Sequence, residues 1–224
     1  LPVVTDTVAR TAAGAVHVRN EGDRSLAVRL TVADFTQSED GRHAFLPAGS
    51  DPRGCGPDIR VTPEAASIPA GASEQIRFHV AGAPADRSCW FLLFVEHPAP
   101  SGSGVLIRQR IGVKVFAVPP GAAPGGEIAA GEVSDTGEAR SLSFRYRNPG
   151  DAPARPSGSV EVRDFRGGLV ATSQVRGFTV LPESARRVEV ELPAGLAPGR
   201  YLAVPVLDFG GEYLAGAQFP FRVP

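Results

Sequence analysis

The chain has 224 residues, of which 26 are glycine and 21 are proline, and this density disfavours long helices because both residues destabilise a helix interior. Hydrophobic residues make up 42% of the sequence, which is ordinary for a globular chain and argues against disorder. The formal net charge is −1, and this balance argues against a protein that coats nucleic acid, which needs a basic surface.

Alternation of apolar and polar residues dominates the first half of the chain and predicts strands. Cys89–Val95 differs, because it is apolar on both faces and therefore typical of a central strand covered on both sides. The polar stretch Thr36–Pro57 indicates the longest irregular loop. Strands are expected at Ala15–Asn20, Leu26–Phe35, Ile59–Pro63, Gln75–Val80 and, closing the first unit, Val105–Val118.

Residues 120–126 are rich in proline and glycine and carry no side chain able to anchor a core, so they predict a linker. The second half repeats the pattern of short strands and turns, with a hairpin signal at Arg166-Gly167-Gly168. Each half offers about seven short strands, the dimensions of an immunoglobulin-like sandwich. We therefore expect an all-β protein with two immunoglobulin-like β-sandwich domains, residues 1–119 and 127–224, joined by that linker.

The sequence contains two cysteines, Cys55 and Cys89, and their spacing does not match a zinc site. The chain begins at Leu1 and contains no methionine, which fits an exported protein whose signal peptide has been removed. In an oxidising compartment the two cysteines are expected to form one disulfide that holds the long loop to the central strand. Two buried free thiols are the alternative.

Patterns that carry catalytic chemistry are not found in the sequence. The four histidines lie in different segments without metal-ligand spacing, and no nucleophile elbow or phosphate-binding loop occurs. Asp34 and Asp164 each precede a phenylalanine at the end of an expected strand, where we expect them to organise turns. We predict no enzyme activity, no metal and no cofactor, and the scattered tryptophan and tyrosines do not favour a sugar-binding lectin.

The predicted strand Val105–Val118 has an apolar stripe on one face. Such a stripe can simply be core. If the strand lies at a sheet edge, its free N–H and C=O groups can instead pair with a partner strand while pockets take alternate side chains. The sequence leaves both possibilities open. The stripe consists of Val105, Ile107, Gln109, Ile111, Val113 and Val115.

Several motifs in residues 1–120 resemble, in their order and spacing, the N-terminal domain of the PapD-like periplasmic chaperones that assemble pili. Asn20 stands where that family ends its second strand with asparagine. Lys114–Pro119 is similar to the family's ending of its long strand, with a lysine five residues before a proline. The remaining matches are Pro57–Pro63, Ile68–Gly71, Gln75–Arg77 and Phe91–Pro98.

The resemblance implies donor-strand complementation, in which the chaperone lends its long edge strand to an incomplete pilin sandwich. Lys114 would anchor the C-terminal carboxylate of the client. Val105 and Ile107 would enter the client's groove, Gln109 would take the third position, and Ile111 and Val113 would continue the stripe. The family's partner arginine has an offset from the asparagine that falls on Val4 here, and Arg10 is the candidate if the turn is shortened.

The resemblance also implies an exported pilin-like subunit as partner, with an outer-membrane usher as a second candidate, and a periplasmic protein that is monomeric or weakly self-associating. No stretch of about 18 apolar residues occurs, so no membrane-spanning helix is predicted. The second half resembles a generic immunoglobulin-like domain of the bacterial envelope more than the usual second domain of a pilus chaperone. The alternative function is a structural or adhesive cell-envelope module without chaperone activity.

Overall fold

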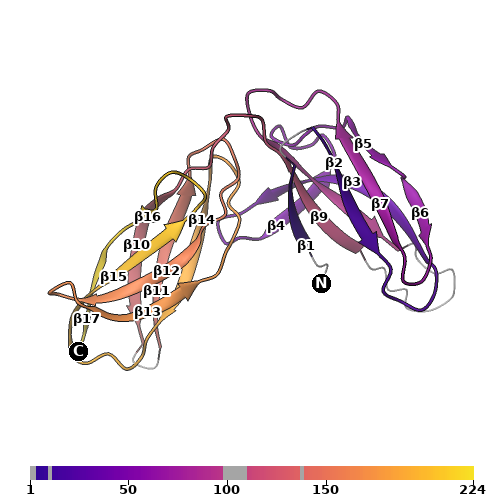
Figure 1. The fold of residues 1–224 in the computed structure, drawn as a ribbon. Coiled ribbons are helices and arrows are strands. Elements are labelled where there is room, and N and C mark those ends of the chain that lie inside the picture. The colour runs from indigo at the N-terminus through magenta and orange to yellow at the C-terminus, as the bar shows by residue number, and fades with distance from the viewer. Residues whose placement is uncertain (1–3, 10–11, 98–109, 137–138) are drawn as a thin grey trace. The chain divides into compact units, whose positions relative to one another are not determined.

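A computed structural model of the protein describes residues 4–9, 12–97, 110–136 and 139–224, and the regular elements in these ranges are all strands (Figure 1). The expected all-β class with two sandwich-like halves is confirmed. Within the described ranges, no helix has the length and apolar character needed to cross a membrane. The contacts of the chain define two units, the first made of residues 1–36 and 43–121, the second of residues 37–42 and 122–224.

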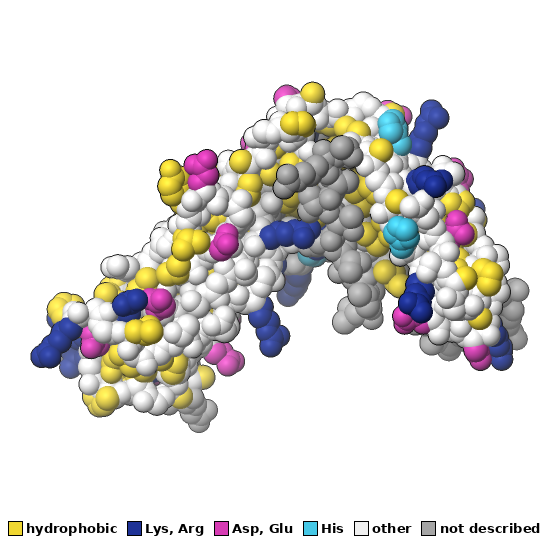
Figure 2. Space-filling model, viewed as in Figure 1, with side chains coloured by type: hydrophobic (Ala, Val, Ile, Leu, Met, Phe, Trp, Pro, Cys, Tyr) yellow, Lys and Arg dark blue, Asp and Glu magenta, His cyan; other side chains and the backbone are white. Residues whose placement is uncertain are grey.

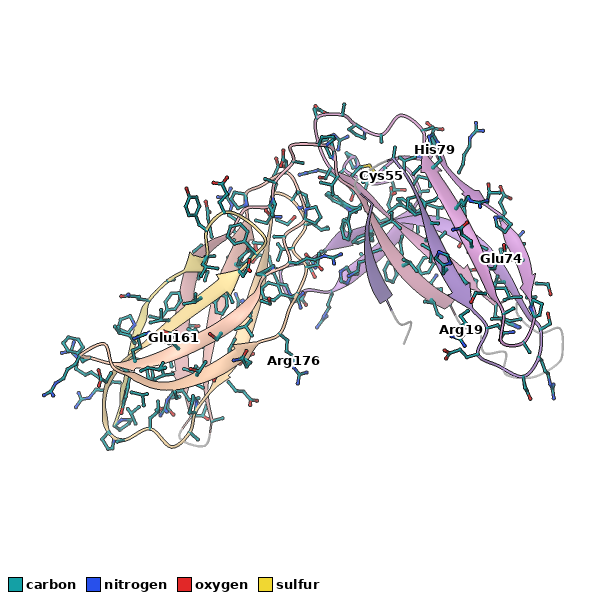
Figure 3. The ribbon with its side chains drawn as sticks, viewed as in Figure 1. Arg19, Cys55, Glu74, His79, Glu161 and Arg176 are labelled. Atoms are coloured by element: carbon teal, nitrogen blue, oxygen red, sulfur yellow. A yellow bond between two sulfur atoms is a disulfide. The ribbon has the colours of Figure 1, made fainter. Side chains whose placement is uncertain are left out.

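The first unit contains two sheets. The larger has the strand order β1-β9-β8-β3-β4, with β6 paired to β3, and the smaller has the order β2-β7-β5. Figure 3 shows Cys55 and His79 toward one end of this unit and Arg19 and Glu74 toward the other. The strands are β1 (Val4–Ala9), β2 (Ala13–Arg19), β3 (Leu26–Gln37), β4 (His43–Pro47), β5 (Ile59–Thr62), β6 (Ala65–Ile68), β7 (Ser73–Val80), β8 (Cys89–Glu96) and β9 (Arg110–Ala117).

Strand β8 lies between β9 and β3, and all eight of its residues are buried, which confirms the predicted central strand. One face of β8 enters the core between the two sheets. The other face is also covered, and this double burial explains the uninterrupted apolar sequence. The buried core of the unit includes Val28, Leu30, Ile68, Ile76, Phe78, Phe91, Leu93, Val113 and Val115.

The irregular loop predicted over Thr36–Pro57 is wrong in part. Strand β3 continues to Gln37, and β4 (His43–Pro47) pairs with it inside the predicted loop. The sequence did not reveal this hairpin, because its turn is polar and a five-residue strand shows little alternation of apolar and polar residues. Strands β1 and β6 also lie in segments where no strand was predicted. Each has a neighbour in the sheet, β9 for β1 and β3 for β6, and this pairing compensates for a weak local signal.

The second unit also has two sheets, ordered β10-β11-β14 and β13-β12-β15-β16, with β17 paired to β15. The predicted hairpin at residues 166–168 is confirmed between β12 and β13. Asp164 Oδ1 accepts the N–H groups of Arg166 and Gly168, both at 2.8 Å, so this aspartate organises the turn as expected. The strands are β10 (Glu127–Asp135), β11 (Arg140–Asn148), β12 (Ser157–Asp164), β13 (Leu169–Val175), β14 (Ser184–Leu192), β15 (Gly199–Asp208), β16 (Ala215–Gly216) and β17 (Phe219–Val223).

The core of the second unit lies between its two sheets and includes Leu142, Phe144, Val160, Val162, Ala203 and Leu207. Tyr146 is buried in the same core, its hydroxyl donates to the Gly125 carbonyl at 2.8 Å, and burial raises the pKa of its phenol. Residues 123–126 are thus held on the second unit, since Ala123 N–H also bonds Asp151 at 2.7 Å. The role of residues 120–126 as a linker, and the domain limits at 119 and 127, stay predictions.

Candidate functional site

The predicted client-binding residues fall in two groups. Arg10, Val105, Ile107 and Gln109 lie outside the described residues. Ile111, Val113 and Lys114 lie on β9, so this strand carries the described part of the predicted site.

Strand β9 has a neighbour on each side over most of its described length. It pairs antiparallel with β8 and parallel with β1, in a register that runs from Val4 beside Gly112 to Ala9 beside Ala117. Residues 112–117 are therefore not a free sheet edge. Arg110 and Ile111 precede the described pairing with β1. A partner strand could pair with β9 only from that end.

The two faces of β9 differ in character. Val113 and Val115 point into the core between the sheets and are buried, whereas Ile111, on the same face, is 47% exposed. The outer face presents Arg110, Gly112, Lys114 and Phe116. Val113 therefore supports the first sandwich, and among the described apolar members of the stripe Ile111 is the accessible one.

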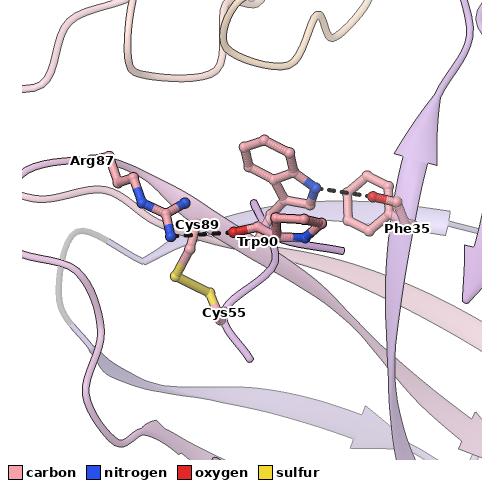
Figure 4. Close-up of a disulfide and its surroundings, with 6 residues drawn as sticks. Phe35, Cys55, Arg87, Cys89 and Trp90 are labelled. Carbon is pink, nitrogen blue, oxygen red and sulfur yellow. Dashed lines mark hydrogen bonds between the residues drawn. A yellow bond between two sulfur atoms is a disulfide. The ribbon is translucent and has the colours of Figure 1, made fainter. Parts of the chain in front are cut away.

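An aromatic cluster covers the outer face of the larger sheet. The Trp90 indole N–H donates to the Phe35 carbonyl at 2.9 Å (Figure 4). Phe35 meets Phe116 edge-on with ring centroids 6.1 Å apart, and Phe45 meets Phe94 edge-on at 5.5 Å. Four of these rings are buried and Phe45 is 38% exposed. The sequence analysis missed this cluster because its members come from β3, β4, β8 and β9, and only the strand pairing gathers them.

Cationic side chains lie against this aromatic cluster. Lys114 is only 8% exposed, and its Nζ lies 6.0 Å from the centroid of the Phe35 ring. Arg110 is exposed, with its guanidinium carbon 4.3 Å from the centroid of Phe94. Both contacts have the geometry of cation–π interactions. The apolar stem of a lysine can be buried while its ammonium stays close to the surface, so Lys114 combines a packed stem with a charged end.

The register of β1 against β9 identifies an acidic residue that the sequence analysis did not consider. Asp6 lies beside Lys114, and Val4 lies beside Gly112. The family's spacing between its arginine and the asparagine points to Val4, which lies on this strand. The residue beside Lys114, however, is an aspartate. No local sequence signal reveals this, because the register of a parallel pair is set by strands far apart in the chain.

The predicted disulfide between Cys55 and Cys89 is confirmed, with a Cα–Cα distance of 4.8 Å (Figure 4). It ties the loop after β4 to the start of β8. The Cys55 N–H donates to the Trp90 carbonyl at 3.1 Å, and Arg87 donates to the Pro52 carbonyl at 3.2 Å. This loop therefore lies firmly on the strand that carries Trp90.

The remaining charged groups give no sign of a metal or catalytic centre in the part of the chain that the structure describes. No group of three or more histidine, cysteine, aspartate or glutamate side chains there could hold a metal ion. His17, His79 and His97 are exposed, and His43 is half-buried against the Phe35 ring at 5.8 Å between centroids. On the face shown in Figure 2, basic and acidic side chains are interspersed over each unit.

Comparison with known proteins gives a result at the level of structure only. No family model matches the sequence, and no curated protein matches it. Among solved structures, the class 5 fimbriae chaperone CfaA is 14% identical with a TM-score of 0.54, over 100% of this chain and 97% of that one. The YadV chaperone is 18% identical with a TM-score of 0.51, over 97% of each chain. A chaperone–tip adhesin complex of CFA/I fimbriae biogenesis is 15% identical, with a TM-score of 0.53 over 100% and 97%. The chain therefore has the two-domain fold of fimbrial chaperones, as the resemblance implies.

Proposed function

We propose that this protein is a periplasmic chaperone that binds an exported pilin-like subunit by pairing a strand of the subunit with β9. The observation that carries the proposal is the likeness of fold to fimbrial chaperones over the whole length of the chain. One of these neighbours is described as a complex with a tip adhesin, which favours a fimbrial subunit as the client. An outer-membrane usher is a further proposed partner, which would receive the loaded subunit.

The place of binding in this proposal is the start of β9. The pairing of β1 with β9 begins at Gly112, and the chain before that point is where a client strand would add to the sheet. Ile111 offers an exposed apolar side chain there, and Val105, Ile107 and Gln109 would continue the contact on the same face. Main-chain hydrogen bonds would supply affinity, and the alternate side chains would supply fit.

Lys114 is the proposed anchor for the C-terminal carboxylate of the client. Its stem packs in the aromatic cluster, so the ammonium has few conformations to lose when a carboxylate arrives. Asp6 lies beside it in the register of β1 and β9. A second cation would strengthen the site, and we assign that role to Arg10.

Strand-forming peptides that copy the C-termini of pilin-like subunits from the same genome test this proposal. Each peptide is made with a free C-terminal carboxylate and with an amide, and binding is followed by fluorescence anisotropy. The free acid should bind about tenfold more tightly, since a hydrogen bond to a charged group contributes about 1.5–3 kcal/mol. Lys114→Gln should abolish this difference, and Arg60→Gln, which removes an exposed charge from the smaller sheet, should preserve it. Absence of binding by every peptide would refute the proposal.

A structural or adhesive envelope module is the second candidate, and one observation favours it. Strand β1 already occupies the edge of β9 from Gly112 to Ala117, so much of the strand has its partner within the chain. Such a module would show no preference for a free carboxylate in the peptide assay. Adhesion would instead need a surface ligand that does not compete with strand peptides.

A further inference from the structure

We propose that the second unit binds the surface of an anionic phospholipid membrane through a patch beside the β12–β13 hairpin. This patch, which we call the hairpin patch, consists of Phe165, Leu169, Val170, Arg200 and Arg222. It contains no residue of β9. The inference therefore goes beyond the proposed chaperone function and does not depend on it.

The apolar side chains of the hairpin patch are open to solvent. Phe165 is 65% exposed, Leu169 is 58% exposed and Val170 is 47% exposed. They flank the turn at residues 166–168, at the end of the unit where β17 runs to the C-terminus (Figure 1). Exposed large apolar side chains that gather at one place mark an interaction site.

The register of the sheet places two arginines beside these apolar side chains. Tyr201 is buried in the core, so its neighbour Arg200 points to the outer face, and Arg222 lies directly across from Arg200 on β17. The guanidinium carbon of Arg200 lies 4.4 Å from the centroid of the Phe165 ring, in the geometry of a cation–π interaction. Figure 2 shows hydrophobic and basic side chains together at this end of the unit, on the left of the view.

Arg200 and Arg222 repel each other in the protein alone. Residues directly opposite on antiparallel strands have Cβ atoms about 5 Å apart, and like charges at such positions are destabilising. Both arginines are exposed, and neither forms an ion pair with a carboxylate in the described ranges. A phosphate group between them would relieve the repulsion, and an arginine can bind phosphate with two parallel hydrogen bonds.

The acidic side chains next to the hairpin patch have other partners. Glu161 forms an ion pair with Arg163 at 2.6 Å, and Arg163 also donates to the Gly167 carbonyl at 2.8 Å. Asp164 accepts the N–H groups of its own turn. The hairpin patch therefore keeps its positive charge, which complements a surface that carries anionic phosphate groups.

The position of the apolar side chains favours a lipid layer over a folded protein. They flank a tight hairpin turn, which presents a convex surface. A lipid layer has no fixed shape to match, so apolar side chains can enter its acyl boundary while the arginines stay at the head groups. A folded partner would instead need a hollow that matches the turn.

Flotation of the full chain with lipid vesicles measures this binding. Vesicles of phosphatidylcholine that also contain phosphatidylglycerol should bind the protein more tightly than phosphatidylcholine alone, and added salt should release it. Arg200→Gln/Arg222→Gln should weaken binding to the anionic vesicles about 25-fold, since each cation near such a surface contributes about fivefold. Phe165→Ser/Leu169→Ser should weaken it about tenfold, because apolar area no longer leaves water.

The matched control is Arg155→Gln/Arg176→Gln. It removes two exposed arginines of the same unit at the opposite ends of β12 and β13 from the hairpin, so the net charge changes equally. This variant should bind as the wild type does. If both double arginine variants weaken binding alike, the effect is one of net charge and the inference is wrong. Circular dichroism verifies that each variant is folded.

Three further results would overturn the inference. The first is equal binding to neutral and anionic vesicles. The second is displacement of the protein by inorganic phosphate at the concentration of the lipid phosphate, which would indicate a site for the free ion. The third is no binding to any vesicle, which would leave a protein as the occupant of the hairpin patch. None of these results affects the proposed function, because the strand peptides are tested on β9 and Lys114.

Discussion

Asn20 and Asn148 share a pattern of four side-chain hydrogen bonds at corresponding places in the two sandwiches, and Asn148 Oδ1 accepts one more from the Gly125 N–H at 2.8 Å. Each asparagine is buried and lies at the end of the second strand of its unit, counted in chain order. An arginine comes directly before it, and a glycine comes two residues after it. Each Oδ1 accepts the N–H of that glycine at 3.0 Å. The Nδ2 groups donate to three carbonyls each, those of Arg24, Ile68 and Pro69 and those of Ala152, Val180 and Leu181.

Replacement of either asparagine by alanine should cost about 2 kcal/mol of unfolding free energy, because it leaves buried carbonyls without a donor. Aspartate has nearly the same shape but should cost more, since its carboxylate would face those carbonyl oxygens. Urea unfolding measures both. Trp90 is the one tryptophan of the chain, so its fluorescence reports the first unit for Asn20, and circular dichroism reports Asn148. An aspartate variant as stable as the wild type would contradict this account.

The Cys55–Cys89 disulfide should stabilise the first unit by roughly 3–4 kcal/mol, because it closes a loop between cysteines separated by 34 positions. The double variant Cys55→Ser/Cys89→Ser should unfold at a lower urea concentration, followed by Trp90 fluorescence. Reductant should lower the midpoint of the wild type and leave the double variant unchanged. If reductant leaves the urea midpoint of the wild type unchanged, the disulfide does not stabilise the fold.

Gly54 should not tolerate alanine. A Cβ at this position would lie 2.7 Å from Oδ1 of the fully buried Asp34, whose Oδ2 accepts the Asp51 N–H at 2.8 Å. We expect Gly54→Ala to cost about 1–3 kcal/mol by overpacking. Gly195→Ala, where no atom lies within 4 Å of the added Cβ, should be nearly neutral. Less-than-additive losses in Gly54→Ala/Asp34→Ala would confirm that the two positions are coupled.

Sequence reasoning found the fold class, the central strand and the disulfide, because each leaves a local signature: alternation, a run of apolar residues, a pair of cysteines. It also placed Lys114 on the strand now seen as β9. It could not find Asp6 beside Lys114 or Arg110 on Phe94, because both depend on register between strands. Nor could it assign residues 37–42 to the second unit, since that assignment rests on contacts with residues more than a hundred positions away.

Glu39, in the segment 37–42, should make the second unit sensitive to acid. The Arg145 guanidinium hydrogen-bonds its carboxylate, with Nε 3.1 Å from Oε1, and the Glu39 carbonyl accepts the Arg187 N–H at 2.6 Å. The hydrogen bond from Arg145, with the charges of Arg145 and Arg187, lowers the pKa of Glu39 below its ordinary value of 4.5. A carboxylate with a lowered pKa in the folded state stabilises that state above its unfolded pKa, and this stabilisation is lost as the pH falls through the folded pKa.

Glu39→Gln should therefore be less stable than the wild type at pH 7, and the difference should shrink as the pH falls below about 4.5. Urea unfolding followed by circular dichroism between pH 3 and 7, as a range that spans the titration of a carboxylate, measures this. Glu21→Gln, in the exposed turn after β2, is the control and should follow the wild type. Arg145→Gln should reproduce the Glu39→Gln profile, because either change removes the same pair. A difference between wild type and Glu39→Gln that stays constant with pH would mean that the ionised carboxylate is not what holds this segment.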